Sequence, residues 1–461
     1  MSRDAAVARA ARHFDEGQFL ADLARRVAMP TESQNPERRQ ALYDYLALEI
    51  GPSLAKLGYG FRVFDNPDPR FGPFLVAERI EAAHLPTVLT YGHGDVIRGQ
   101  EASWRQGLSP WRIVQEGERI YGRGTADNKG QHSINIAALA AVIETRGALG
   151  FNSRILVETG EETGSPGLRA FCETHGDILK ADVLIGSDGP RVRRDRPCLF
   201  MGTRGALNFD LALTLREGGH HSGNWGGLLA NPGIILAHAL ATIVSPKGEI
   251  LIPELKPARI PNSVRHALAP IALDGGEGAP AIDADWGEPG LTPVERVFAW
   301  NTFEVLAYRT GDPDRPVNAV PPKAVAHCQI RYVVDTDPAA FLPAIRRHLD
   351  ARGFKAVEVT PSRETMFVAT RLDPEHPWAQ WAAASMTRTD GAPPDVIPNL
   401  GGSLPNDVFT DVLGLPTLWV PHSYSSCSQH APNEHLLAPL VRQGLQLMAG
   451  LYWDMGEAGH P

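Results

Sequence analysis

Seven histidine and acidic residues come just after apolar, strand-like runs of the sequence or just before a long apolar segment. His93 and Asp95, for example, directly follow the apolar run at 87–91. Clustered carboxylates repel one another unless cations lie between them, and imidazole and carboxylate ligands without thiolates suit Zn²⁺, Co²⁺ or Mn²⁺. If these side chains meet, they predict a metal site for hydrolytic chemistry. The residues of the set are His93, Asp95, Asp127, Glu161, Glu162, Asp188 and His430.

Short apolar runs alternate with helical patterns between residues 60 and 200. Three runs, at 87–91, 155–157 and 183–185, are typical of buried strands, and a buried helix is predicted at 134–143. This alternation predicts an α/β domain with a mostly parallel sheet. Because the carboxyl ends of parallel strands face one crevice, we expect the loops that follow them to bring the seven side chains together.

Each of these motifs also has a simpler interpretation. An H-x-D motif is more often a tethered surface histidine than a metal ligand, and adjacent glutamates are usually solvated charge. Asp127 could cap the helix that follows it, and Asp188, which precedes Gly189, could be an ordinary turn residue. The metal site is favoured because all of them fall where an element of the predicted sheet ends or a helix begins.

A different pattern begins near residue 203. Apolar and polar residues alternate along its first strand, which is typical of a strand with one solvated face and predicts an α+β segment with an antiparallel sheet. Residues 244–300 are rich in Pro and Gly and carry no assignment. The predicted elements are strands at 208–215 and 324–334 and helices at 234–243 and 338–352.

The α/β pattern resumes after about residue 368, and two amphipathic helices are predicted within residues 1–60. We therefore predict an α/β protein whose mostly parallel-sheet catalytic domain is interrupted by a smaller α+β lid or dimerisation domain. The predicted bounds are 1–202 and 367–461 for the catalytic domain and 203–366 for the inserted one. The later elements are a helix at 378–386 and a strand at 417–420.

Composition narrows the class of protein. The chain has 461 residues and a formal net charge of −9, which disfavours a general nucleic-acid binder. Its four cysteines lie far apart without a C-x-x-C pair, which suits a reducing compartment. The charged N-terminus lacks the apolar stretch of a signal peptide, and no run is long enough to span a bilayer. These features predict a cytoplasmic protein that binds neither nucleic acid nor membrane.

Three motifs closely resemble those of the M20 family of dinuclear metallopeptidases. That family includes carnosinase-like dipeptidases, carboxypeptidase G-type enzymes, acetylornithine deacetylase and succinyl-diaminopimelate desuccinylase. The motifs are YGHGD at 91–95, YGRGTADNKG at 121–130 and EETGS at 161–165, and the resemblance extends from about residue 85 to 440. It implies a catalytic domain interrupted by a smaller lid, and a homodimer that forms through this inserted domain.

The resemblance also implies roles for the seven residues. Asp127 would bridge two divalent ions, which we expect to be Zn²⁺, with Mn²⁺ or Co²⁺ as alternatives. Glu161 would be the general base, and Asp95 would accept the second ring N–H of His93. Cys427, three residues from His430, is a less favoured ligand. The remaining ligands would be His93 and Asp188 at the first ion and Glu162 and His430 at the second.

Further motifs resemble substrate-binding segments of the family. His221, in HHSGNWGG at 220–227, would reach the substrate oxyanion from the partner subunit, although the histidine doublet could merely cap a loop. Asn318 begins an N-x-I-P-like turn with Val at the third position. Arg331 would bind a substrate carboxylate, or else pair with Asp335 or Asp337. Backbone N–H groups around Gly402 and Ser403, in the GGSLP loop, would approach the same carboxylate.

These observations predict a metal-dependent hydrolase that cleaves the amide bond of a small dipeptide-like substrate with a free carboxylate. The GGSLP and HSG segments favour a dipeptidase. The nearest alternative is an N-acyl amino acid deacylase, and an inactive metal-containing binding protein is the alternative from another class. The serine-hydrolase motif G-x-S-x-G and the single-zinc motif H-E-x-x-H are both absent from the sequence.

Overall fold

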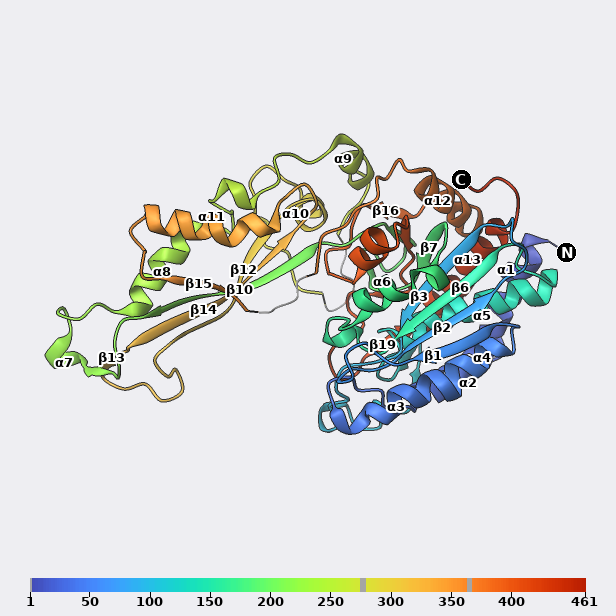
Figure 1. Cartoon of the computed structure of the whole chain (residues 1–461), viewed down its shortest axis with the longest axis horizontal. Coiled ribbons are helices and arrows are strands. Elements are labelled where there is room, and N and C mark those ends of the chain that lie inside the picture. Colours follow the sequence, from blue (N-terminus) through green and yellow to red (C-terminus); the bar gives the residue numbers. More distant parts are fainter. Residues whose placement is uncertain (1, 274–278, 363–366) are drawn as a thin grey trace.

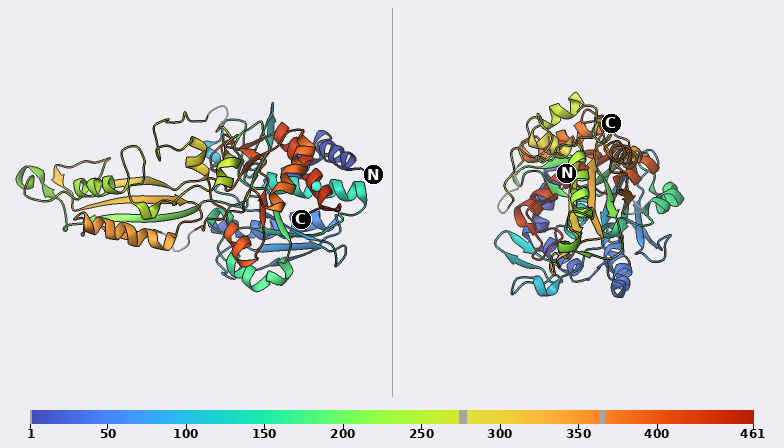
Figure 2. Two further views of the ribbon diagram at one scale, coloured as in Figure 1. Left: turned by 90° about the horizontal axis from the view of Figure 1, so that it is seen from above. Right: turned by 90° about the vertical axis from the view of Figure 1, so that its left-hand side faces the viewer.

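Two separate β-sheets organise the chain, an eight-stranded one and a four-stranded one, which we call the large sheet and the small sheet. The computed structural model describes residues 2–273, 279–362 and 367–461. The molecule is elongated, with the small sheet at one end and both termini at the other (Figures 1 and 2). The small sheet is built entirely from residues 205–361.

The large sheet has the strand order β1-β2-β6-β3-β7-β17-β9-β16. Strands β6, β3, β7 and β17 run parallel to one another. The pairs β1–β2, β2–β6 and β17–β9 are antiparallel. The predicted fold class, a mostly parallel α/β sheet with a smaller α+β part, is therefore confirmed. The strands are β1 (Gly60–Phe64), β2 (Phe74–Arg79), β3 (Thr87–His93), β6 (Asn152–Glu158), β7 (Val183–Gly186), β9 (Cys198–Phe200), β16 (Asp395–Ile397) and β17 (Thr417–Trp419).

Helices cover both faces of the large sheet, so its central strands are apolar on both sides. In β3, Val88 belongs to the core under α1, α5 and α13, whereas Leu89 belongs to the core under α6. This double burial explains the continuous apolar runs that predicted the strands. The helices are α1 (Arg3–Asp15), α5 (Lys129–Arg146), α6 (Leu168–Leu179), α12 (Pro377–Asp390) and α13 (Ala438–Met455).

The N-terminal region contains more helix than the two helices predicted. This region contains α2 (Gln18–Val27) and a helical run from α3 (Arg39–Asp44) to α4 (Gly51–Ala55). It also contains α1, which packs against α5 and α13. The buried residues of α1 are alanines at positions 6, 10 and 11, and its other positions are largely charged. Such small residues make a weak apolar stripe, which is why periodicity did not predict this helix.

The small sheet is antiparallel throughout, with the order β12-β14-β10-β15, and the helices α8 and α11 cover one face. Phe209, Leu211 and Leu213 of β10 point into this core, and the intervening residues are less buried. The domain bounds at 202/203 and 366/367 stay a prediction, and residues 363–366 lie outside the described residues. The elements are β10 (Gly205–Thr214), α8 (Pro232–Ile243), β12 (Thr302–Thr310), β14 (Lys323–Tyr332), α11 (Pro338–Ala351) and β15 (Glu358–Pro361).

The segment at 244–300, which had no assignment, contributes mainly to the large-sheet core. Its helices α9 (Asn262–Leu268) and α10 (Pro293–Phe298) bury Val264 and Phe298 in the same apolar cluster as strand residues of the large sheet. Of this segment, residues 274–278 lie outside the described residues.

Among the residues described, no helix is both long and apolar enough to cross a membrane. All four cysteines are buried free thiols.

Candidate functional site

Five of the seven predicted site residues stand at or just after the carboxyl ends of three neighbouring parallel strands. β3 ends at His93, opposite Glu158 at the end of β6, and β6 leads into a short 3-10 turn that carries Glu161 and Glu162. β7 ends two residues before Asp188. Because β6, β3 and β7 are adjacent, all of these side chains reach the same edge of the large sheet, as predicted from the parallel topology.

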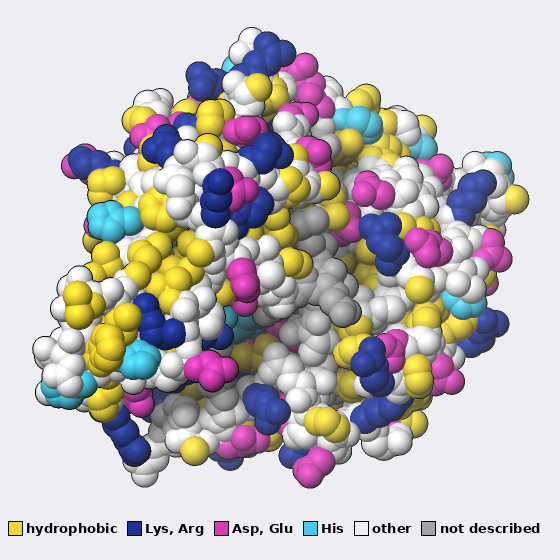
Figure 3. Space-filling model, turned by 60° about the vertical axis from the view of Figure 1, so that its left-hand side comes forward, with side chains coloured by type: hydrophobic (Ala, Val, Ile, Leu, Met, Phe, Trp, Pro, Cys, Tyr) yellow, Lys and Arg dark blue, Asp and Glu magenta, His cyan; other side chains and the backbone are white. Residues whose placement is uncertain are grey.

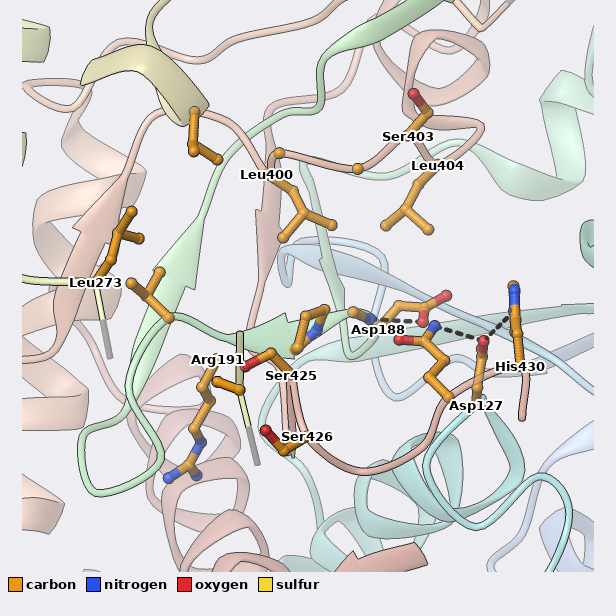
Figure 4. A pocket seen from close by; sticks show the side chains of 18 of the residues that line it. Asp127, Asp188, Arg191, Leu273, Leu400, Ser403, Leu404, Ser425, Ser426 and His430 are labelled. Atoms are coloured by element: carbon orange, nitrogen blue, oxygen red, sulfur yellow. Dashed lines mark hydrogen bonds and ion pairs between the residues drawn. The ribbon is translucent and has the colours of Figure 1, made fainter. Parts of the chain in front are cut away.

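The structure forms two groups of ligand atoms that share one carboxylate. His93, Asp127 and Asp188 make the first group, and Asp127, Glu162 and His430 make the second, each with its ligand atoms within 4.8 Å of one another. Asp127 Oδ1 lies 2.9 Å from His93 Nε2, and its Oδ2 lies 2.9 Å from His430 Nε2. The two oxygens of one carboxylate therefore face different groups, which is the arrangement that a bridging ligand requires. Figure 4 shows the side of Asp127 that faces His430.

The electrostatics of this cluster are those of a cation site. Burial, with a smaller contribution from the carboxylate of Asp127, raises the pKa of Asp188 to about 6 and that of Glu162 to about 7. Although burial acts to raise it, hydrogen bonds with His430 and His93 hold the pKa of Asp127 well below its usual value. His430, hydrogen-bonded to Asp127 and Glu162, has its pKa raised to about 11. Negative charge is thus concentrated in a buried space.

The donor set fits two divalent cations. Asp188 Oδ2 is buried without a hydrogen-bond partner among the residues that the structure describes, which is costly unless a cation takes that place. All five side chains offer nitrogen or oxygen atoms, the ligands that Zn²⁺, Mn²⁺ and Co²⁺ share. Cys427 is in neither ligand group of the described residues.

Asp95 lies beside the second ring nitrogen of His93 and also holds the turn of the two glutamates. The backbone oxygen of Asp95 lies 3.1 Å from His93 Nδ1 in a hydrogen bond, and its carboxylate is farther away, at 3.4 Å. The carboxylate instead accepts the backbone N–H groups of Glu161 and Glu162, each at 3.2 Å. Asp95 therefore fixes the turn that presents the two glutamates, in addition to orienting the His93 ring through its main chain.

Glu434 is a supporting residue that the sequence analysis did not single out. Its buried carboxylate accepts hydrogen bonds from Arg123 Nη1 at 2.7 Å and from the backbone N–H groups of Gly124, Ala126 and Asp127 at 2.9–3.1 Å. These bonds hold the Gly-rich turn that carries Asp127. In the sequence Glu434 stands four positions after His430, in the segment His430-Ala431-Pro432-Asn433-Glu434.

The loop that delivers His430 is wound through unusual backbone conformations. Ser428, His430 and Asn433 all have positive φ, at 57°, 58° and 64°. Non-glycine residues seldom adopt this region, and such strain is concentrated at functional sites. Gln429 in the same loop donates to Asp127 Oδ2 at 2.6 Å, so the loop contacts the shared carboxylate with two side chains. Gln429 is a further contact that the sequence analysis missed.

Two cavities adjoin the cluster. One has a volume of about 860 Å³ and is lined by Gly402 among others, and the other has a volume of about 950 Å³ and is lined by Arg331. Glu161, Ser403 and His430 line both. The two cavities therefore meet at the candidate metal site.

Arg331 does not pair with either of the acidic residues that were considered as its partners. Its Nη1 donates to Ser403 Oγ at 2.7 Å and its Nε donates to Gln329 at 3.0 Å. Asp335 pairs with Arg371, and Asp337 caps helix α11. The structural-pair alternative for Arg331 is therefore wrong, and its guanidinium lines the second cavity.

His221 and Asn318 lie at the far end of the small-sheet part, in the region of α7 (Ser222–Trp225) and β13 (Ala319–Val320) (Figure 1). The His221 ring accepts the backbone N–H of Gly223, so it caps α7, and the Asn318 carbonyl accepts from Ser222. Neither residue belongs to the described lining of the two cavities. Within one chain, the fold therefore does not bring them to the cluster.

Comparison with known proteins gives consistent results. Residues 89–454 match the model of peptidase family M20/M25/M40. The chain is 27% identical to the Beta-Ala-His dipeptidase of Mus musculus, over 97% of this chain and 95% of that protein. It is 26% identical to the Cys-Gly metallodipeptidase dug1 of Schizosaccharomyces pombe, over 93% and 94%. The solved structure of the dipeptidase Dug1p from Saccharomyces cerevisiae superposes with a TM-score of 0.80 at 22% identity, covering 99% of this chain and all of that one.

Proposed function

Because this chain belongs to peptidase family M20/M25/M40 and is thus an amide-bond hydrolase, we propose that it is a metal-dependent dipeptidase acting on small substrates with a free carboxylate. The observation that carries the proposal is the pair of ligand groups joined through Asp127, with Glu161 beside them where two cavities meet. The two relatives described above, both named dipeptidases and matched over nearly their whole length, support this substrate class.

The proposed cofactors are two divalent cations, with Zn²⁺ as the first choice and Mn²⁺ or Co²⁺ as alternatives. His93, Asp127 and Asp188 would hold one, and Asp127, Glu162 and His430 would hold the other. When bound, such cations supply Lewis acidity, which polarises a carbonyl group and makes water more acidic. Asp95 would be a positioning residue, because its carboxylate accepts the backbone N–H groups of the turn that carries the glutamates and lies 3.4 Å from His93 Nδ1.

Glu161 would transfer the proton. Its carboxylate lies 4.0 Å from His93 Nε2, it lines both cavities, and it is in neither ligand group. Burial raises its pKa well above the usual value, and the neighbouring carboxylates act in the same direction. A carboxylate in this place can take a proton from the attacking water and return it to the leaving amine.

Arg331 would bind the carboxylate terminus of the substrate. It lines the second cavity, and its guanidinium is held in place by the hydrogen bond to Ser403. A guanidinium can bind a carboxylate through two parallel hydrogen bonds. Gly402 and Ser403 would approach the substrate from the loop between the cavities.

A hydrolysis screen tests the proposed activity. We expect the full chain, loaded with Zn²⁺, Mn²⁺ or Co²⁺, to release amino acids from dipeptides faster than from N-acetyl or N-succinyl amino acids. Release from the acylated substrates alone would instead assign a deacylase. Binding of two metal ions without turnover of any substrate would assign a binding protein.

Substitution of the two adjacent glutamates separates their proposed roles. We expect Glu161→Gln to retain both metal ions and to lose kcat by about 10²- to 10⁴-fold, because it removes the proton acceptor. We expect Glu162→Gln to lose about one ion per chain in elemental analysis, because it removes a ligand of the second group. Glu173→Gln, on the exposed side of α6, is the control and should change neither quantity. Full turnover by Glu161→Gln would refute the general-base role.

Arg331 can be tested with substrates that lack its proposed partner. We expect Arg331→Ala to lower kcat/KM for a dipeptide by about 10- to 150-fold, the range for a lost hydrogen bond to a charged group. The same variant should lose much less on the corresponding dipeptide amide, which has no carboxylate. Arg347→Ala serves as the control, because the side chain of Arg347 on α11 is exposed. Equal losses on both substrates would show that Arg331 acts only through the loop at Ser403.

We also propose a homodimer that forms through the small-sheet part. Strand β12 is an edge strand with the apolar side chains Val305, Leu306 and Tyr308 exposed, and Ile234 of the neighbouring α8 is 60% exposed. Figure 3, in which this end of the molecule comes forward, shows exposed apolar side chains among charged ones. An unpaired apolar edge favours pairing with a second chain. In such a dimer, His221 of one subunit would reach the candidate site of the other subunit.

Complementation between two inactive variants tests this arrangement. Co-expressed Glu161→Gln and His221→Ala chains should recover about a quarter of wild-type activity, because half of the symmetric dimers would be mixed and each would hold one intact site. Light scattering should give twice the chain mass. Co-expression of Glu161→Gln with the double variant Glu161→Gln/His221→Ala is the control and should recover none. If His221→Ala alone keeps full activity, the proposed role of His221 fails.

A further inference from the structure

The two cavities that meet at the cluster differ in chemical character. The cavity with Arg331 carries polar side chains on its walls, including Gln34, Asn208, His327 and Gln329. The walls of the other, of about 860 Å³, are mostly apolar away from the cluster, although Ser425, Ser426 and Arg191 also line it. Its apolar wall residues include Leu273, Ile282, Val297, Phe298, Leu400 and Leu404. Its volume falls within the range of about 300–1,000 Å³ for small-molecule sites.

The apolar wall stands directly against the ligand turn. A Cβ atom at Gly189, the residue after Asp188, would lie 2.9 Å from Leu400 Cδ2, so Leu400 is packed on the backbone of that turn. Likewise, a Cβ atom at Gly401 would lie 2.9 Å from Val297 Cγ1. Figure 4 shows Leu273 at one end of the cavity and His430 at the other, with Leu400 between them and close to Asp188. A group placed at the cluster therefore has apolar surface within reach on this side.

The wall is held by the large-sheet core and not by loops alone. Phe298, Leu400 and Leu404 are each less than 10% exposed and belong to one buried cluster with strand residues of the large sheet. Phe298 lies on α10, whose N-terminus is fixed by a capping box between Thr292 and Glu295. The segment at 244–300 thus supplies a preformed face of the cavity.

Charged groups on this wall are few among the described residues. Apart from the cluster itself, Arg191 lines the cavity, but its Nε donates to the carbonyl of Pro421 and its Nη1 donates to Gln443. These bonds direct the guanidinium away from the cluster (Figure 4). Other polar groups of this wall include Ser425, Ser426 and Arg191 Nη2, and Arg191 Nη2 has no hydrogen-bond partner among the described residues. A charged substituent placed here would therefore lie mostly against apolar side chains and lose part of its hydration.

The orientation of a substrate follows from these two surfaces. If Arg331 takes the carboxylate in the polar cavity, the scissile amide lies at the residues common to both cavities, Glu161, Ser403 and His430. The residue on the acyl side of that amide then extends into the apolar cavity. We propose that this cavity binds the side chain of the substrate's first residue, so that the chain prefers dipeptides whose amino-terminal residue is large and apolar.

This preference rests on the proposed dipeptidase function and makes it specific. One apolar group placed in a hydrophobic pocket discriminates by about 10- to 200-fold in kcat/KM. We therefore expect the metal-loaded full chain to hydrolyse Leu-Gly and Phe-Gly about 10- to 200-fold more efficiently than Gly-Gly. The chain should also favour them over Glu-Gly and Lys-Gly, whose charged side chains would be desolvated, and over β-Ala-His, which has no side chain on its first residue.

Charge introduced on the wall provides the second measurement. Leu273→Lys and Ile282→Lys should each reduce the ratio of kcat/KM for Leu-Gly to that for Gly-Gly, and should raise the ratio of Glu-Gly to Leu-Gly. Ile282 is 58% exposed, so a lysine there is compatible with folding. Ile80→Lys is the matched control, because Ile80 is 51% exposed and is not among the described lining residues of this cavity. This control should leave both ratios unchanged.

The outcomes separate this inference from the function on which it rests. Hydrolysis of dipeptides without preference at the first position, or with a preference for acidic first residues, would overturn the apolar-cavity proposal alone. A preference that follows the second residue, seen with Gly-Leu in place of Leu-Gly, would overturn the orientation. Hydrolysis of N-acyl amino acids but of no dipeptide would overturn the proposed dipeptidase function.

Discussion

The concentration of negative charge around Asp127 is the constraint on which the arrangement of this protein depends. Asp127, Glu162 and Asp188 share one buried space, and both oxygens of Asp127 are engaged by imidazoles. Carboxylates so close together repel one another in a medium that screens weakly. The fold must therefore hold them with groups outside the cluster, and cations would complete the balance of charge.

Most of that support comes from backbone N–H groups and from residues distant in sequence. Glu434, more than three hundred positions from Arg123, accepts from that guanidinium and from three N–H groups of the turn before Asp127. Asp95 holds the turn of Glu161 and Glu162 in the same manner. The large sheet provides the rigid base, because its central strands are buried on both faces. The site thus lies at the edge of a sheet that is buried on both faces.

The two parts of the chain meet at the site. Arg331, on the small sheet, donates to Ser403, which lies in a loop beside the large sheet, and Arg204 donates to the carbonyl of Gly401 in the same loop. A change in the position of the small sheet would therefore move the proposed carboxylate-binding group relative to the cluster. α10 in turn places Phe298 in the apolar cavity wall. The proposed substrate contacts therefore come from the small sheet and α10, whereas the candidate metal ligands come from loops at the edge of the large sheet.

Local pattern alone was sufficient for the fold class and for the gathering of the site residues. Apolar runs such as 87–91 predicted strands because both faces of the large sheet are covered, and parallel strands necessarily end at one edge. Helix α1, by contrast, was missed because its buried residues are alanines, and the packing of 244–300 was missed because it depends on contacts with strands far away in sequence. That His93, Asp127, Glu162, Asp188 and His430 bind metal stays a prediction.

The sequence by itself determined which residue types stand at the strand ends, because that depends only on local apolar periodicity and on the topology that it implies. Tertiary structure alone decided the partners of those residues: the backbone contacts of Asp95, the bond from Arg331 to Ser403 and the apolar wall around Leu400. Each of these joins segments separated by tens to hundreds of residues. A single sequence carries no local signal for such contacts, since they arise only when separate elements pack together.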